Sequence, residues 1–151
     1  MKYFYFMSSP LGKLYIGEEE GKVIYVGCKE KIDGKILKTP TISKAIGQLE
    51  EYFAGKRKEF TLPIHVEGGD FQKRVLHHIM DIPYGKAVDY TEVAQAINCP
   101  NGARAVGNAL GNNPILILIP CHRVIRRDKK LGGYRGGSQK KSYLLKLEGY
   151  L

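Results

Sequence analysis

The sequence predicts an α+β protein, with a small antiparallel β-sheet and one helix in its N-terminal part and a mostly helical C-terminal part that contains a helix-turn-helix. Three observations support this prediction. Apolar and polar residues alternate from residue 2 to residue 29, as in strands buried on one face. Apolar residues recur at helical spacing after residue 70. Residues 56–69 between these segments contain Pro63 and a glycine pair, as a connector would. We therefore expect two domains, 1–66 and 67–151.

In the N-terminal part, turn residues divide the alternating segment into about three strands of an antiparallel meander. The turns fall at residues 9–12 (SPLG) and 20–21 (EG). Residues 29–38 are polar and contain glycine, so we expect a surface loop there. Either Thr41 or Ser43 can cap a helix that extends through Phe53 and is ended by Gly55.

In the C-terminal part, apolar periodicity and capping residues predict four helices. These are 71–80 with Asp70 as its N-cap, 91–97 beginning at Thr91, 103–110, and a last helix capped by Ser138 that runs through Leu147. The continuous apolar run 115–119 predicts a short buried strand.

The bulk composition is that of an ordinary globular protein. Hydrophobic residues make up 43% and charged residues 26% of the 151 residues. No stretch approaches the roughly 18 to 20 apolar residues of a membrane span. The first residues lack the continuous apolar core of a signal peptide. We expect a mature, cytoplasmic protein that does not enter a membrane.

The formal net charge is +9. Excess positive charge favours polyanionic partners, because neutralising phosphates releases condensed counterions. A solvated lysine surface is the alternative interpretation of the same charge.

The three cysteines, Cys28, Cys99 and Cys121, are odd in number and widely spaced. Together with the four histidines they form no zinc-ligand pattern. We therefore expect reduced thiols, with neither a disulfide framework nor a structural metal site.

Residues 119–124 read Ile-Pro-Cys-His-Arg-Val, and this is the segment most informative about chemistry. Pro120 has no N–H for a sheet ladder and ends the expected strand, so Cys121 is expected at the edge of the core and half in a pocket. A base or cationic neighbours there would raise its thiolate fraction, which is otherwise a few per cent at pH 7. The alternative is a small, buried and inert cysteine.

Residues 91–110 have the proportions of a helix-turn-helix, whose second helix commonly enters a DNA groove. That helix carries mainly small residues, which permit close approach but few hydrogen bonds to base edges. Arg104 is the one long cation near its start. We expect close, sequence-indifferent contact with DNA; two helices packed on a core are the alternative.

A glycine-rich loop follows, residues 131–137 (LGGYRGG). Its glycines allow the backbone to come close to a flat group, against which Tyr134 could pack. The alternative is a flexible basic loop.

Several of these segments together resemble the O6-alkylguanine-DNA alkyltransferases, also called methylated-DNA–protein-cysteine methyltransferases. The matching motifs are 82–86 (IPYGK), 89–94 (DYTEVA), 103–107 (ARAVG), 113–115 (NPI), 120–124 (PCHRV) and 144–149 (LLKLEG). The similarity is good from about residue 71 to residue 149. It is faint in the first lobe, where the strand-rich layout and the turn at 9–12 are similar.

The resemblance implies a catalytic role for five residues. Cys121 is the expected nucleophile and permanent acceptor of the alkyl group. His122 is the expected base, acting through a bound water and oriented by Glu148. Asn113 is expected to hold the segment around the cysteine, and Tyr90 to donate to the guanine ring as it departs.

The resemblance also implies binding roles. Arg104 is the expected finger that fills the gap left by the rotated nucleotide, in the minor groove. The residues expected at DNA are Arg104, Ala103, Thr91 and Arg123, and those expected around the base are Tyr90, Val124, Tyr134 and Arg135. The implied activity is irreversible transfer from O6-alkylguanine, and from O4-alkylthymine, in double-stranded DNA. A monomer would act once, on a flipped nucleotide and with no cofactor or metal.

Two departures from the family bear on these expectations. Some members carry serine at the position of Arg135. The role there is ascribed to a backbone amide, so we expect the change to be tolerated and to bear on which larger alkyl groups react. Some relatives hold zinc in the first lobe, but Cys28 has no plausible companions here, and we expect no zinc.

Three other functions are compatible with parts of the pattern. One is an alkyltransferase-like protein that binds lesions without transfer, but such relatives lack a cysteine at this position. A cysteine hydrolase would need an oxyanion hole and would turn over repeatedly. A helix-turn-helix regulator would need base-reading side chains that the second helix lacks.

Overall fold

The computed structural model describes residues 1–30 and 33–151 and divides into two compact units. The first comprises Met1–Val66 with Pro114–Leu116, and the second comprises Glu67–Asn113 with Ile117–Leu151. Both contain strands and helices, which confirms the α+β prediction. Among the described residues, none of the helices combines the length and apolar character that crossing a membrane requires.

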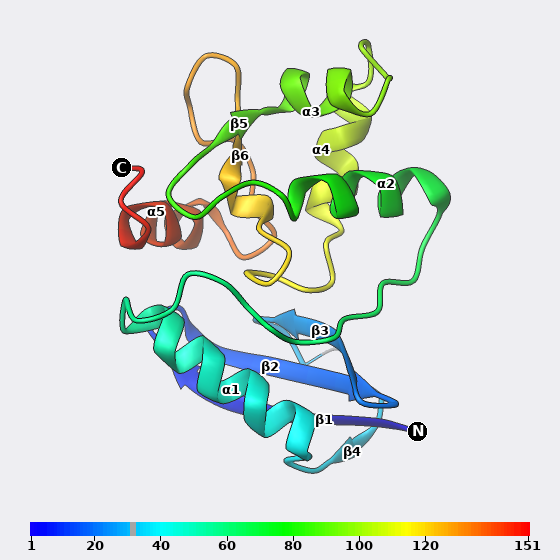
Figure 1. Cartoon of the computed structure of the whole chain (residues 1–151), viewed down its shortest axis with the longest axis vertical. Coiled ribbons are helices and arrows are strands. Elements are labelled where there is room, and N and C mark those ends of the chain that lie inside the picture. Colours follow the sequence, from blue (N-terminus) through cyan, green and yellow to red (C-terminus); the bar gives the residue numbers. More distant parts are fainter. Residues whose placement is uncertain (31–32) are drawn as a thin grey trace. The chain divides into compact units, whose positions relative to one another are not determined.

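The first unit is a four-stranded sheet with a helix against one face (Figure 1). Its elements are β1 (Lys2–Ser9), β2 (Gly12–Glu19), β3 (Lys22–Gly27), β4 (Lys35–Ile36) and α1 (Pro40–Phe53). The strand order is β3-β2-β1-β4. The antiparallel meander β1-β2-β3 was predicted. The parallel edge strand β4 was not, because its two residues lie in the segment 29–38 expected to be a loop. Residues 31–32 of that expected loop lie outside the described residues.

Turn chemistry and burial explain this unit. Gly12 and Gly21 have φ of 93° and 76°, values that glycine adopts without strain, and they close the two hairpins. The helix cap differs from the prediction: the hydroxyl oxygen of Thr39 accepts a hydrogen bond from the Ile42 amide at 3.2 Å. Pro40 then occupies the first helical turn, where no N–H is needed. The cap therefore precedes Thr41 and Ser43.

The second unit contains the remaining helices and a two-stranded sheet. Its elements are α2 (Asp70–Ile79), β5 (Val88–Asp89), α3 (Tyr90–Ala96), α4 (Ala103–Gly111), the 3-10 turn η1 (Cys121–Arg123), β6 (Val124–Ile125) and α5 (Ser138–Leu147). All four predicted helices are present. Their caps differ: Asp70 and Ser138 are first helical residues rather than caps, and Asp89 caps α3 by accepting from the Glu92 amide at 2.8 Å.

The apolar run 115–119 is buried as predicted, but it is not a strand. Ile115 forms an isolated parallel bridge with Val26 of β3, and Ile117 turns the chain with φ of 73°. All five side chains are at most 7% exposed. A short apolar run indicates burial without specifying the backbone conformation, so the sequence could not distinguish this turn from a strand.

The parallel pair β5-β6 brings together two segments that carry candidate site residues. Val88 pairs with Val124, and Asp89 with Ile125. Tyr90 follows β5 directly, and Cys121 lies three residues before β6. This short pairing therefore brings the start of α3 next to η1, although some 30 residues separate them in the chain.

Candidate functional site

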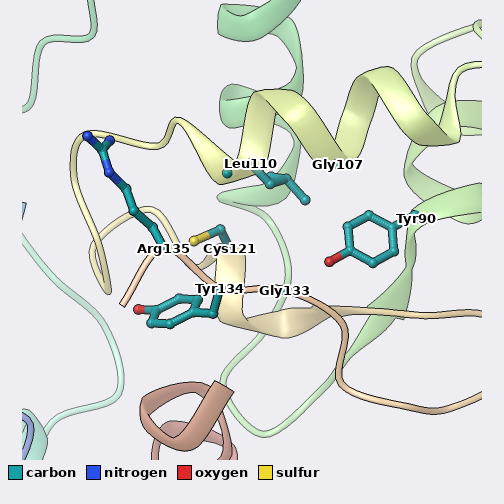
Figure 2. Close-up of a pocket in the computed structure, with 8 residues that line it drawn as sticks. Tyr90, Gly107, Leu110, Cys121, Gly133, Tyr134 and Arg135 are labelled. Atoms are coloured by element: carbon teal, nitrogen blue, oxygen red, sulfur yellow. The ribbon is translucent and has the colours of Figure 1, made fainter. Parts of the chain in front are cut away.

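Cys121 lines a cavity of about 320 Å³ in the second unit. The other lining residues are Tyr90, Gly107, Leu110, Gly111, Gly133, Tyr134 and Arg135 (Figure 2). The Cys121 residue is only 4% exposed, and the hydrogen bonds Cys121 N–H to Ile119 O and Arg123 N–H to Pro120 O fix the turn that presents it. The thiol thus lies at the boundary between core and cavity, where the sequence placed it.

Burial raises the pKa of the Cys121 thiol to about 11. A hydrogen bond from Asn113, the charge of Lys141, the backbone and the charge of Arg135 each lower this pKa, but together they do less than burial does. The neighbours expected to favour the thiolate are therefore present. Desolvation outweighs them, and the thiol of the free protein is protonated at neutral pH.

His122, Arg123 and Glu148 form a buried charged cluster. Nε2 of His122 lies 2.6 Å from Oε2 of Glu148. Nε and Nη2 of Arg123 donate to the two carboxylate oxygens at 2.8 and 3.1 Å, and the Gly85 amide donates at 3.2 Å. Burial lowers the pKa of His122, although the Glu148 carboxylate opposes this. The resting imidazole is therefore neutral, with its Nε2 proton facing Glu148.

The other ring nitrogen of His122 is the available base. Within the described residues, Nδ1 is buried and has no hydrogen-bond partner. With Nε2 as donor, Nδ1 carries a lone pair that can accept a proton. His122 directly follows Cys121, so this lone pair belongs to the same turn as the thiol.

Arg123 occupies a different place from the one expected at DNA. The residue is 6% exposed, and Nη1 donates to the Ile82 carbonyl at 2.7 Å while the rest of the guanidinium binds Glu148. An arginine committed to a buried carboxylate has no surface left for phosphate. Its charge instead holds Glu148 in place, which corrects the sequence-based assignment.

Asn113 joins the cysteine segment to the glycine-rich loop. Its Nδ2 donates to the Ile119 carbonyl at 2.9 Å, and its own backbone carbonyl accepts from Nη1 of Arg135 at 2.8 Å. The Asn113 side chain is completely buried. It therefore fixes the chain two residues before the thiol.

Tyr90 and Tyr134 lie on the cavity wall. Burial, and then the negative charge of a Cys121 thiolate, raise the pKa of Tyr90, so its hydroxyl remains a donor. Figure 2 shows this hydroxyl directed toward the middle of the cavity. Gly132 has φ of 76°, and a Cβ there would lie 2.9 Å from the Tyr90 hydroxyl. Glycine is therefore required beside this tyrosine. Val124, expected nearby, is fully buried.

Lys141 is a site residue that the sequence reasoning missed. Its side chain is fully buried, and Nζ donates to the Val124 carbonyl at 2.6 Å and the Gly133 carbonyl at 3.1 Å. Burial lowers the pKa of its ammonium group to about 8, opposed by the charge of Cys121. The helical spacing to the buried residues Leu144 and Leu145 places Lys141 on the apolar face of α5, and this signal could have identified it.

A second, wider cavity of about 1060 Å³ shares Tyr90, Gly107 and Gly133 with the first. Its other lining residues are Ala103, Arg104, Asn108, Arg126, Lys130 and Gly132. Arg104 and Ala103 thus lie together at the start of α4, as expected. Thr91, one residue into α3, is partly exposed and does not line either of these two cavities.

Within the described residues, no group of three or more His, Cys, Asp and Glu side chains could hold a metal ion, and all three cysteines are free.

Comparisons with known proteins match both units. Residues 2–66 match the family model of the 6-O-methylguanine DNA methyltransferase ribonuclease-like domain, and residues 70–150 match that of its DNA binding domain. The constitutive methylated-DNA–protein-cysteine methyltransferase of Bacillus subtilis is 39% identical, over 98% of this chain and 96% of the relative. The methyltransferase of Methanosarcina acetivorans is 42% identical, over 97% and 98%. The crystal structure of Mycobacterium tuberculosis OGT in complex with DNA superposes with a TM-score of 0.91 at 39% identity, covering 97% of this chain and 92% of that one.

Proposed function

The chain belongs to the 6-O-methylguanine DNA methyltransferase family, and from this premise we propose that it repairs DNA by moving the alkyl group of O6-alkylguanine, and of O4-alkylthymine, onto Cys121. The observation that carries the proposal is a buried thiol that opens on a cavity between Tyr90 and Tyr134, beside a buried His-Glu pair. The thioether has no easy hydrolytic exit, so each molecule acts once.

The damaged nucleotide must leave the duplex to reach this thiol, because the reacting bond lies inside the base stack. The wider cavity supports this step: Arg104, Arg126 and Lys130 supply positive charge for phosphates, and the small residues of α4 permit close approach to the minor groove. Arg104 at the start of α4 fills the gap in the stack. The flipped base then enters the smaller cavity, lined by Tyr134 and by the backbone near Val124 and Arg135.

Activation of the thiol follows lesion binding. Because the pKa of Cys121 in the free protein is about 11, a proton must be removed as the base enters. The proton passes through a bound water to Nδ1 of His122, and the imidazolium so formed is stabilised by Glu148, which Arg123 holds in position. Asn113 fixes the segment that carries the sulfur.

Transfer is a displacement at the alkyl carbon. The Cys121 sulfur forms the new S–C bond as the O6–C bond breaks, and the electron pair of that bond goes to the guanine. The Tyr90 hydroxyl donates to the ring as this negative charge develops. The proton lost by the thiol ends, in net terms, on the repaired guanine, which stays in the DNA strand, and no cofactor or metal takes part.

The two parts of the chain have different roles in this proposal. We propose that residues 1–66 form a supporting N-terminal lobe and residues 67–151 a DNA-binding and alkyl-transfer domain. We also propose a monomer that acts in the cytoplasm, where its three free cysteines remain reduced.

The test is incubation with duplex DNA containing one O6-methylguanine, followed by intact-mass and peptide analysis. We expect one methyl group on the peptide that contains Cys121, and none in Cys121→Ser, which should still bind the duplex. Binding with no mass gain in the wild type would indicate a lesion-binding protein. Repeated turnover by one molecule would indicate a hydrolase. Either result would overturn the proposal.

A further inference from the structure

Arg135 is the charged member of the smaller cavity. Of the eight described residues that line this cavity, it alone carries a formal charge, and no carboxylate is among them. Figure 2 shows Arg135 and Tyr90 on opposite sides of Cys121, with the sulfur directed toward the Arg135 side. The start of the Arg135 side chain therefore lies on the side of the sulfur, while its guanidinium extends away from Cys121 to the Asn113 carbonyl.

The guanidinium of Arg135 is anchored but not saturated. Within the described part of the chain, its one hydrogen bond runs from Nη1 to the Asn113 carbonyl. A guanidinium has five N–H donors in a planar fork that matches a carboxylate. The residue is exposed, so its long side chain can adjust toward a ligand at little cost. Turning this side chain toward the cavity would therefore bring donors for an anion to its lining.

The geometry of displacement directs a substituent toward the cavity wall. Sulfur, reacting carbon and departing oxygen must lie nearly in line, so any further atoms on that carbon project sideways. With the guanine between Tyr90 and Tyr134, the sideways space left for a substituent next to the sulfur lies on the Arg135 side of the cavity. An uncharged substituent meets the apolar part of this wall. A carboxylate there would repel the developing thiolate unless a cation were close to both.

We propose that Arg135 makes the site selective for O6-alkylguanines whose alkyl group ends in a carboxylate, the smallest being O6-carboxymethylguanine, over uncharged groups of the same size. This inference rests on the proposed function and names a substrate class within it. Arg135 acts as a specificity-determining residue: its fork binds the carboxylate while the reacting carbon lies on the sulfur. The charge of Arg135 already acts on Cys121, since it lowers the thiol pKa against the effect of burial.

Transfer of a carboxymethyl group follows the same bond changes as methyl transfer. The Cys121 sulfur bonds to the CH2 carbon of the carboxymethyl group, the bond between this carbon and O6 breaks, and the electron pair of that bond stays on the guanine, which remains in the DNA. The thiol proton ends on guanine. The product is S-carboxymethylcysteine, whose carboxylate stays paired with Arg135.

The test compares three duplexes of one sequence, which carry O6-methylguanine, O6-carboxymethylguanine or its uncharged amide, O6-carbamoylmethylguanine. Single-turnover rates are measured by the mass gained on the Cys121 peptide. The informative quantity is the ratio of the carboxymethyl rate to the carbamoylmethyl rate. We expect this ratio to be about 10 in the wild type, as one charge-assisted hydrogen-bonded pair provides. It should fall to about 1 or below in Arg135→Gln and take an intermediate value in Arg135→Lys.

Lys146→Gln is the matched control, because it removes one positive charge from an exposed position on α5 that does not line the cavity. Its ratio should equal that of the wild type. A shared decrease in Lys146→Gln and Arg135→Gln would mean that net charge sets the ratio, and would overturn the proposal.

The remaining outcomes separate this inference from the proposed function. If no duplex transfers its group, the proposed function fails. If methyl is transferred and the two larger groups react equally or not at all, the function stands and the role of Arg135 is wrong. A wild-type preference that persists in Arg135→Gln would likewise exclude this residue as its source.

Discussion

Nε2 of His122 lies 2.6 Å from Oε2 of Glu148, with both side chains withdrawn from solvent. The same carboxylate accepts two hydrogen bonds from Arg123, so the acid is held from two sides. This arrangement fixes the imidazole tautomer and leaves Nδ1 as the base. It also offsets the charge that the ring gains when it takes a proton, so one buried carboxylate serves both orientation and catalysis.

Replacing this carboxylate with an amide separates its contributions. In Glu148→Gln, Arg123 keeps a buried charge without its counterion, and an imidazolium at His122 loses its stabilising partner. We expect a loss of about 3 kcal/mol in the free energy of unfolding and a roughly 100-fold slower methyl transfer. Urea denaturation and single-turnover kinetics measure the two effects. Glu51→Gln, which removes an exposed ion pair with Arg57, should cost under about 1 kcal/mol. Unchanged transfer in Glu148→Gln would restrict Glu148 to a folding role.

The raised pKa of Cys121 predicts how the free protein reacts with iodoacetamide. Because the thiol pKa is about 11, the thiolate fraction should grow about tenfold per pH unit from pH 7 to pH 10. Modification of the Cys121 peptide, followed by mass spectrometry, should rise with this slope. Cys121→Ser identifies the signals of the other two cysteines. A plateau below pH 8 would show that the thiolate forms before any lesion binds.

The buried ammonium group of Lys141 predicts a pH dependence of stability. Its pKa is about 8 in the folded protein and about 10.4 in an unfolded chain. Between these values the unfolded chain binds more protons, so this lysine makes stability rise with pH from about 8 to 10.4. The Cys121 thiol has the opposite effect above pH 9, because its pKa is raised on folding.

The comparison therefore uses a Cys121→Ser background. There, Lys141→Met should remove the rise in unfolding free energy between pH 8 and pH 10, as measured by urea denaturation. Lys146→Met, an exposed change on the same helix, should retain it. Parallel pH profiles with and without Lys141 would contradict a lowered pKa at this position.

Arg104 should matter only when a duplex has to be opened. In Arg104→Ala, repair of O6-methylguanine in duplex DNA should slow about tenfold, because the gap left by the flipped nucleotide is no longer filled. Reaction with the free modified base should change little. Arg57→Ala, a change at a partly exposed arginine in the first unit, supplies the control. Equal losses on the duplex and on the free base would exclude the finger role.

The sequence predicted those features that depend on local patterns. Alternation predicted the meander, apolar spacing predicted the four helices, and the Pro-Cys-His-Arg segment placed the thiol beside a cavity. Residues brought together by distant pairing were harder to predict. The placement of Tyr90 and Cys121 around one cavity depends on the two-residue pair β5-β6, which is too short to leave a pattern in the sequence.

Charged residues in the core were also misread from the sequence. An arginine beside a candidate nucleophile of a DNA-binding protein suggests a phosphate contact, but Arg123 turns inward to Glu148. The sequence assigned no role to Lys141, one of three lysines in α5, yet it lies on the apolar face of its helix. Net charge does not tell buried cationic side chains from exposed ones. The position of a lysine relative to the buried leucines of the same helix does.

The chain passes between the two units more than once. Near residue 114 it returns for three residues, and the Val26 amide donates to the Pro114 carbonyl while the Leu116 amide donates to the Val26 carbonyl. A truncated protein starting at residue 67 would keep this segment but lose β3. The backbone groups of residues 114 and 116 would lose their hydrogen-bond partners, and Ile115 would become exposed. We expect such a protein to self-associate at this segment, which directly follows Asn113. Truncation at residue 67 is therefore not expected to yield an intact second unit.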